Sequence, residues 1–145
     1  MVQILVKKLD KNIKLPTYKT SGSSGMDLVA HIKKKITINP SKTAIIPAGI
    51  AVAIPKNYEI QIRPRSGLAA KKGISVLNTP GTIDSDYRGE IKIILINLSK
   101  KPFVVKLAER VAQMVLCPVT KAKLKEVKNL PKTLRGKGGF GSTDK

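Results

Sequence analysis

Cysteine, tryptophan and acidic residues are scarce in this chain. Of its 145 residues, one is a cysteine, none is a tryptophan and 9 are Asp or Glu. A single thiol, Cys117, has no partner for an intramolecular disulfide, so the sequence predicts a reducing compartment and a structural role for this residue. The low cysteine count therefore excludes a disulfide-stapled secreted domain.

Long hydrophobic runs are missing as well. No stretch reaches the roughly 20 apolar residues that a membrane-spanning helix needs. The N-terminus, MVQILVKKLDK, places apolar residues before its lysines, which is the reverse of a secretory signal. We therefore expect a cytoplasmic protein with no membrane segment. Its length fits one globular domain over residues 1–130, followed by a flexible glycine-rich arm over residues 131–145.

Negative charge is so limited that the formal net charge is +19. Such a surface attracts phosphate groups without regard to sequence. The lysines, however, are spread along the whole chain, and aromatic residues that could stack on bases make up only 3% of it. A nucleic-acid partner is therefore unlikely on these grounds, whereas attraction of a small polyanionic substrate is expected.

Short runs rich in β-branched residues recur between Gly, Pro and Asn residues, and they predict an all-β fold. Residues 58–63, YEIQIR, alternate in the manner of a half-buried strand, with Ile60 and Ile62 on one face. Residues 90–97 and 110–117 are apolar on both faces over part of their length, which predicts cover by a second sheet or another subunit. One short helical turn is expected in RSGLAAKKG, over Leu68 and Ala69, with Ser66 as its cap and Gly73 as its stop.

Three segments carry polar residues that are unusual in a β-sandwich built only for stability. SGSSGMDLVA presents one carboxylate, Asp27, after a turn of small residues, and an isolated Asp in that position is most often a turn residue. PRSGLAAKKG places Arg65, a hydroxyl and a glycine amide at the start of a turn, an arrangement that binds phosphate oxygens but equally caps a helix. In ERVAQMVL, Gln113 lies on an apolar strand beside Arg110 and, if buried, needs a hydrogen-bond partner from a ligand or from a neighbouring subunit.

NTPGTIDSDYRGE, residues 78–90, is the most informative segment. Its turn-forming halves predict a tight hairpin with Asn78 at its base and exposed backbone groups for a guest. The segment also concentrates Asp84, Asp86 and Glu90, a third of the acidic residues in the chain.

The C-terminal RGKGGFGSTDK is costly to order, at about 1 to 2 kcal/mol per residue. It is therefore expected to become fixed only when it binds an anion attached to a flat ring.

These five segments, taken in their order along the chain, resemble the five motifs of the trimeric deoxyuridine triphosphatases (dUTPases). The resemblance runs from Ser21 to Thr143. It implies a jelly-roll, β-clip fold and a homotrimer in which the tail of one chain closes over a neighbour's nucleotide. It also implies hydrolysis of dUTP to dUMP and pyrophosphate, with Mg²⁺ chelated by the triphosphate. Such an activity keeps uracil out of DNA and supplies dUMP for thymidylate synthesis.

Carried over by this resemblance, the catalytic residues are Asp84, which activates the water, and Arg135. Asp27 would meet the waters of the magnesium ion rather than the ion itself. The substrate-binding residues implied are Arg65, Ser66, Gly67, Asn78, Gly81, Thr82, Ile83, Tyr87, Gln113, Phe140, Gly141, Ser142 and Thr143. Two alternatives remain: a dCTP deaminase, whose acid–base glutamate would fall on Ile94, and a non-enzymatic basic jelly roll that binds nucleic acid.

Overall fold

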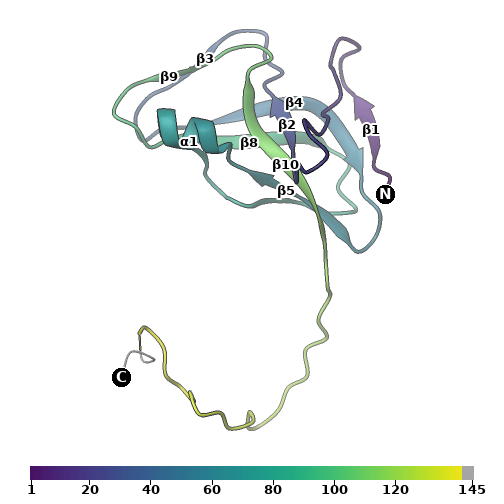
Figure 1. Cartoon of the computed structure of the whole chain (residues 1–145), viewed down its shortest axis with the longest axis vertical. Helices are drawn as coiled ribbons and strands as arrows, with labels where there is room; N and C mark the ends of the chain where they lie inside the picture. The colour runs from purple at the N-terminus through teal and green to yellow at the C-terminus, as the bar shows by residue number, and fades with distance from the viewer. Residues whose placement is uncertain (142–145) are drawn as a thin grey trace.

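The computed structural model describes residues 1–141, which form two packed antiparallel sheets and an extended C-terminal segment (Figure 1). The elements in chain order are β1 Leu5–Lys8, β2 Met26–Val29, β3 Ile36–Ile38, β4 Thr43–Ala53, β5 Tyr58–Arg63, α1 Ser66–Lys72, β6 Ile74–Val76, β7 Gly81–Ile83, β8 Glu90–Asn97, β9 Phe103–Val105 and β10 Arg110–Pro118. The predicted all-β class is confirmed, and so is the single short helix.

One four-stranded sheet has the order β1-β4-β8-β6, the other has the order β2-β10-β5-β7, and β3 pairs with β9. We call the second sheet the site sheet because most of the predicted motifs lie on it. Its registers place Gln113 between Asp27 on β2 and Arg63 on β5. On its other edge, β7 pairs with β5 so that Ile83 lies opposite Ile60.

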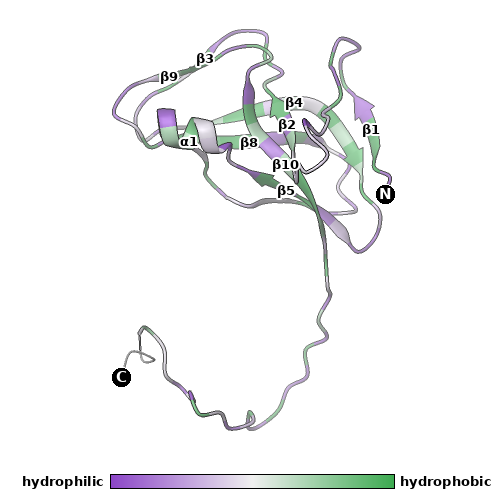
Figure 2. Cartoon of the chain, viewed as in Figure 1, coloured by the Kyte–Doolittle hydropathy of each residue, from purple (hydrophilic) through white to green (hydrophobic). Residues whose placement is uncertain are grey.

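Isoleucine fills most of the space between the sheets. On β8, Ile91, Ile93 and Leu95 are fully buried, whereas Lys92 is exposed. This alternation follows from the two-residue period of a strand. Residues 90–97 read as nearly continuous apolar sequence because Ile94 and Ile96, on the other face of β8, are apolar as well. The expected alternation over residues 58–63 is also confirmed, because Ile60 and Ile62 are buried. Figure 2 shows the hydrophobic colouring concentrated in the strands.

The outer face of the first sheet is apolar too. Ile45 on β4 pairs with Ile94 on β8 and is 61% exposed. Leu77, which follows β6 and donates its N–H to the Ile94 carbonyl, is also exposed. An exposed apolar sheet face of this kind is typical of a surface covered by another subunit.

After Pro118 the chain leaves the sandwich and runs away from it as an extended segment (Figure 1). Residues 120–137 are exposed, and Figure 2 shows hydrophilic and hydrophobic residues mixed along this stretch. The predicted arm, residues 131–145, forms the last part of this segment, and the structure describes it as far as residue 141. No helix in the described part of the chain is long and apolar enough to cross a membrane.

Candidate functional site

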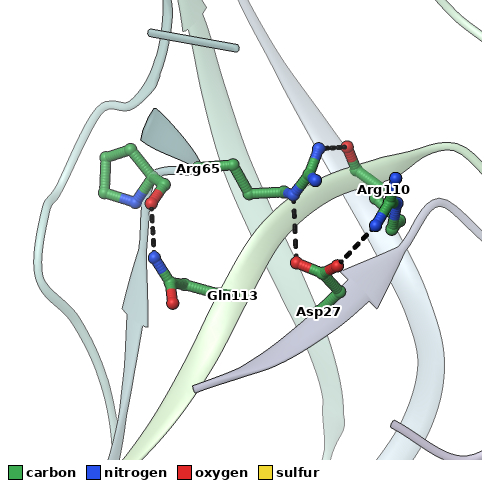
Figure 3. Close-up of polar contacts among 5 residues, drawn as sticks. Asp27, Arg65, Arg110 and Gln113 are labelled. Atoms are coloured by element: carbon green, nitrogen blue, oxygen red, sulfur yellow. Dashed lines mark hydrogen bonds and ion pairs between the residues drawn. The ribbon is translucent and has the colours of Figure 1, made fainter. Parts of the chain in front are cut away.

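The carboxylate of Asp27 is held between two arginines on the site sheet (Figure 3). Its Oδ1 accepts a hydrogen bond from Arg65 Nε at 3.0 Å, and its Oδ2 accepts one from Arg110 Nη1 at 3.1 Å. Arg65 Nη1 also donates to the backbone carbonyl of Arg110 at 3.3 Å. Two guanidinium groups around one carboxylate leave a net positive charge, which suits a phosphate ligand.

Gln113 lies beside this cluster and has the partner that its position on an apolar strand requires. Its Nε2 donates to the carbonyl of Pro64 at 3.0 Å. Gly25 leaves the room that this side chain needs, because a Cβ atom at Gly25 would lie 2.5 Å from Gln113 Oε1. The predicted need for a partner is therefore met within the chain itself.

Replacing Gly25 with Ala is expected to displace the Gln113 amide. The added Cβ would also lie 3.1 Å from Val115, so the strand has little space in which to adjust. Overpacking of this kind costs typically about 1 to 3 kcal/mol. Urea unfolding should show that loss, whereas Gly22→Ala should match the parent, because nothing in the described chain lies within 4 Å of a Cβ at Gly22. Equal stability of Gly25→Ala and the parent would contradict this packing argument.

The helix after Arg65 differs from the prediction at its start. Ser66 is the first helical residue and not the cap; Arg65 holds the cap position, with no side-chain hydrogen bond to the helix. The Arg65 side chain turns to Asp27 instead, while its carbonyl accepts the N–H of Ala69. The predicted stop at Gly73 is confirmed, since this residue has a φ of 64°. Ser66 and Gly67 are exposed, and their amides belong to the first turn, where no intrahelical partner exists.

The segment of residues 78–90 is a strand followed by a turn, and the predicted pairing within a tight hairpin is wrong. Gly81, Thr82 and Ile83 form β7, which pairs with β5 rather than with a strand of its own segment. The Asn78 side chain lies beside the first residue of β7: a Cβ at Gly81 would lie 3.3 Å from its Nδ2. The chain then turns at Asp84, whose carbonyl accepts the N–H of Tyr87 at 3.1 Å.

A hollow of about 150 Å³ lies over this turn, lined by Thr82, Ile83, Asp84, Tyr87, Glu90 and Lys92. Tyr87 donates its hydroxyl to the carbonyl of Glu90 at 3.0 Å, and its ring lies over Gly89, where any Cβ would overlap it. The Asp84 carboxylate is exposed and forms no hydrogen bond or ion pair within the described residues. It is therefore free to bind a water molecule.

A larger cavity, of about 570 Å³, lies between residues 10–19 and strands β2 and β4. Its lining includes Asp27 and Arg110, but none of the turn residues. We place the candidate site at the smaller hollow, which has the free carboxylate, and at the arginine cluster, which borders one end of the larger cavity; the rest of the lining of that cavity is mostly apolar.

The two parts of the candidate site lie on opposite edges of the site sheet. Asp27 is on β2 at one edge and Ile83 is on β7 at the other, with β10 and β5 between them. The Cα atoms of Asp27 and Ile83 are roughly 17 Å apart, because three strand spacings of about 4.8 Å and three residues of about 3.3 Å along the strands separate them. One chain therefore does not bring the turn and the arginine cluster together.

The arm does not approach either part in this structure (Figure 1). Arg135 donates its Nε to the carbonyl of Gly138 at 2.9 Å, and the Gly138 N–H returns a hydrogen bond to the Arg135 carbonyl. Phe140 is fully exposed, and both Phe140 and Gly141 have positive φ. Ser142 and Thr143, which complete the predicted set, lie outside the described residues.

Arg110 and Glu90 are absent from the predicted site residues although the structure places both in it. Arg110 pairs with Asp27 across 83 residues of sequence, and Glu90 lines the hollow. A charged residue at the start of an otherwise apolar strand was the available signal for Arg110. For Glu90 the signal was its place directly after the turn.

Comparison with known proteins matches this geometry to one family. The dUTPase family model matches residues 11–144. The chain belongs to the dUTPase family. Deoxyuridine 5'-triphosphate nucleotidohydrolases from Hydrogenobaculum sp. (strain Y04AAS1) and Rickettsia bellii (strain OSU 85-389) are 54% identical over 142 residues and 56% identical over 144 residues. The alignments cover 98% of both chains in the first case, and 99% of this chain and 96% of the relative in the second. This family membership makes the chain an enzyme, a dUTP diphosphatase.

Solved dUTPases share the fold. A Staphylococcus bacteriophage 80alpha dUTPase variant with dUpNHpp has a TM-score of 0.81 at 26% identity and covers 97% of this chain and 98% of its own. A dUTPase variant from phage phi11 of S. aureus, described with a structural Mg(II) ion, has a TM-score of 0.80 at 21% identity and covers 90% of this chain and 99% of its own. Both likenesses show that this chain shares the fold of these dUTPases.

Proposed function

We propose that this dUTPase hydrolyses dUTP to dUMP and pyrophosphate by attack of water on the α-phosphorus. The free Asp84 carboxylate at the edge of the 150 Å³ hollow carries the proposal. An exposed carboxylate with no competing partner in the described chain can orient a water molecule and take its proton. Asp84 also lies next to the turn that would hold the nucleoside, so the water and the nucleotide would meet at this turn.

The segment around β7 would read the base and the sugar. Asn78, together with backbone groups of Gly81, Thr82 and Ile83, would match the donor and acceptor edge of uracil. Cytosine would leave these groups mismatched, and mismatches of this kind discriminate by about 10⁴ to 10⁵. The ring of Tyr87, fixed over Gly89 by its bond to the Glu90 carbonyl, would lie against the deoxyribose and leave no room for a 2'-hydroxyl.

The arginine cluster would hold the triphosphate. Arg65, the exposed first-turn residues Ser66 and Gly67, and Gln113 are all at one end of the site sheet. Each carboxylate oxygen of Asp27 accepts one hydrogen bond from an arginine and keeps a second lone pair, so this residue can accept hydrogen bonds from metal-bound waters. No three His, Cys, Asp or Glu side chains of residues 1–141 gather into a set that could hold a metal ion directly. A magnesium ion chelated by the triphosphate would supply charge neutralisation when bound.

A homotrimer with sites shared between subunits would bring the two parts together. The separation of roughly 17 Å across the site sheet supports sharing, because one nucleotide must contact both the turn and the arginine cluster. The exposed apolar face around Ile45 and Leu77 supports association, since such a face is unfavourable in water. The arm of a further copy would then reach the same nucleotide, with Phe140 stacked on uracil and Arg135, Ser142 and Thr143 on the γ-phosphate, beside Gly141.

In the cell, such an enzyme would act in the cytoplasm. It would keep uracil out of DNA and supply dUMP for thymidylate synthesis. The net charge of +19 would favour capture of a triphosphate, because a strongly positive field raises the association rate of an anionic substrate. The same positive charge alone does not make the chain a nucleic-acid-binding module.

A pyrophosphate-release assay across dUTP, dTTP, dCTP and UTP tests the function. We expect turnover of dUTP with Mg²⁺ present, at least about 10³-fold slower release from the other three nucleotides, and loss of most activity in EDTA. Equal release from dCTP or UTP would contradict the proposed base and sugar readout. Full activity in EDTA would remove the metal from the mechanism.

A dCTP deaminase is the nearest alternative. Its acid–base glutamate would occupy the position of Ile94, which lies on β8 opposite Ile45 and cannot transfer a proton. We therefore expect no ammonia from dCTP, and stoichiometric release of ammonia would favour the alternative.

A further inference from the structure

Glu90 ties the start of β8 to β4 through its side chain. Its Oε1 accepts the backbone N–H of Gly49 at 2.9 Å, and this hydrogen bond is partly buried. Gly49 lies where the β4–β8 register shifts, between Pro47 and Ala51, and it has a φ of 70°. A buried amide at such an irregularity costs about 1 to 3 kcal/mol when unpaired, so the Glu90 carboxylate stabilises this point of the sheet.

Gly49 is a fixed anchor. On its other side it packs against Ile13 and against the ring of His31; a Cβ at this position would overlap the Ile13 side chain and lie 2.7 Å from His31 Cγ. Its carbonyl accepts the N–H of Leu9 at 2.9 Å. The donor that Glu90 binds therefore has little freedom to move.

From Glu90 the connection continues into the catalytic turn. The Glu90 carbonyl accepts the hydroxyl of Tyr87 at 3.0 Å, and the N–H of Tyr87 binds the Asp84 carbonyl at 3.1 Å. Hydrogen bonds thus lead from the anchor at Gly49, through Glu90 and Tyr87, to the residue proposed to activate water. The ladder between β7 and β5 ends at Ile83, and regular pairing resumes only at Glu90, which lies opposite Ala51 of β4 next to the register shift. The far side of the turn therefore depends on how Glu90 is held at this irregular point.

We propose that Glu90 is a positioning residue for Asp84 and Tyr87. Its side chain fixes the end of the turn, at residue 90, to the Gly49 amide. It does not itself exchange a proton with the nucleotide. This inference rests on the proposed function, since Asp84 and Tyr87 carry the chemistry that Glu90 positions. For this role Glu90 needs an acceptor oxygen at the right distance from the Gly49 N–H, and not a negative charge.

Three substitutions separate these two requirements. Glu90→Gln keeps an acceptor oxygen at the same distance and should retain kcat for dUTP within about 3-fold. Glu90→Asp keeps the charge but withdraws the oxygen by one methylene, and Glu90→Ala removes it. A displacement of about 1 Å costs about 10²-fold in rate, so both should lower kcat by about 10- to 100-fold, and a shift of the residue-90 carbonyl that binds the Tyr87 hydroxyl should also raise KM. The reverse order, with Asp better than Gln, would overturn the proposal in favour of a charge or proton role.

Asp10→Ala serves as the control. Asp10 also accepts a backbone N–H, from Asn12 at 2.9 Å, but it borders the larger cavity. Its removal should leave kcat unchanged. If the parent hydrolyses dUTP and Glu90→Ala is as active as Asp10→Ala, the positioning role is wrong while the proposed function stands; an inactive parent would instead contradict the proposed function.

A second readout does not depend on activity. The chain has three tyrosines, so fluorotyrosine incorporation gives three ¹⁹F NMR signals, and Tyr87→Phe assigns one of them. Glu90→Ala and Glu90→Asp should shift or broaden the Tyr87 signal, whereas Glu90→Gln and Asp10→Ala should leave it in place. An unchanged Tyr87 signal in a folded Glu90→Asp protein would refute the inference, even if Glu90→Ala failed to fold.

Discussion

Replacing Asp84 with Asn is expected to lower kcat by about 10² to 10⁴-fold while dUTP still binds. The carboxylate is exposed, lies at the edge of the hollow and has no partner in the described chain, so its proposed task is to hold and deprotonate water. Asparagine has nearly the same shape and keeps one acceptor oxygen, but it cannot take a proton near neutral pH. Steady-state pyrophosphate release and calorimetric titration with a non-hydrolysable dUTP analogue would measure the two effects separately.

Asp86→Asn is the matched control for this substitution. Asp86 lies two residues further along the same turn, and the hollow is not lined by it. The control removes one negative charge from the same loop and should change kcat by less than about 3-fold. A general effect of charge would make the two variants alike, and a normal kcat in Asp84→Asn would refute the general-base role.

Removing the chain from Arg135 onward is expected to lower kcat/KM by about 10³ to 10⁵-fold, the range typical of a lost arginine finger in phosphoryl transfer. Stacking of Phe140 on a base would add about 1 to 3 kcal/mol. In the structure Arg135 and Phe140 are exposed, so the truncated protein should keep the stability of the sandwich. Pyrophosphate release, thermal unfolding and size-exclusion chromatography would measure the three properties.

Lys137→Ala provides the control within the arm. It removes one exposed positive charge beside Arg135 and should leave kcat/KM within a few-fold of the parent. Arg135→Lys tests the geometry, because lysine keeps the charge but loses the planar fork that binds phosphate oxygens in pairs. Truncation without any loss of rate would mean that the arm has no part in turnover.

The sequence predicts local features of this fold better than long-range ones. The alternation over residues 58–63 identified the buried face of β5, since side-chain direction follows from the two-residue period alone. Pairing of β7 with β5 could not be derived in this way, because turn-forming residues in 78–90 suggested pairing within the segment. Choice of partner depends on which strands the two sheets bring together, and that is decided over the whole chain.

The candidate site shows the same division. Asp27, Asp84 and Gln113 stood out because polar groups in turns or on apolar strands need an explanation. The ion pairs of Asp27 join residues 38 and 83 positions apart, and no local pattern reports such distances. The prediction of Ser66 as the cap was wrong for a related reason: Arg65 holds the cap position, and its side chain binds the Asp27 carboxylate, which is distant in the sequence.

The opposite edges of the site sheet have a genetic consequence if the sites are shared between subunits. A chain with a damaged turn still supplies an intact arginine cluster, and a chain with a damaged cluster still supplies an intact turn. A cell that carries one allele of each kind would assemble mixed oligomers in which some sites combine the two sound halves. Two individually null alleles would therefore rescue each other, whereas two defects at the same edge would not.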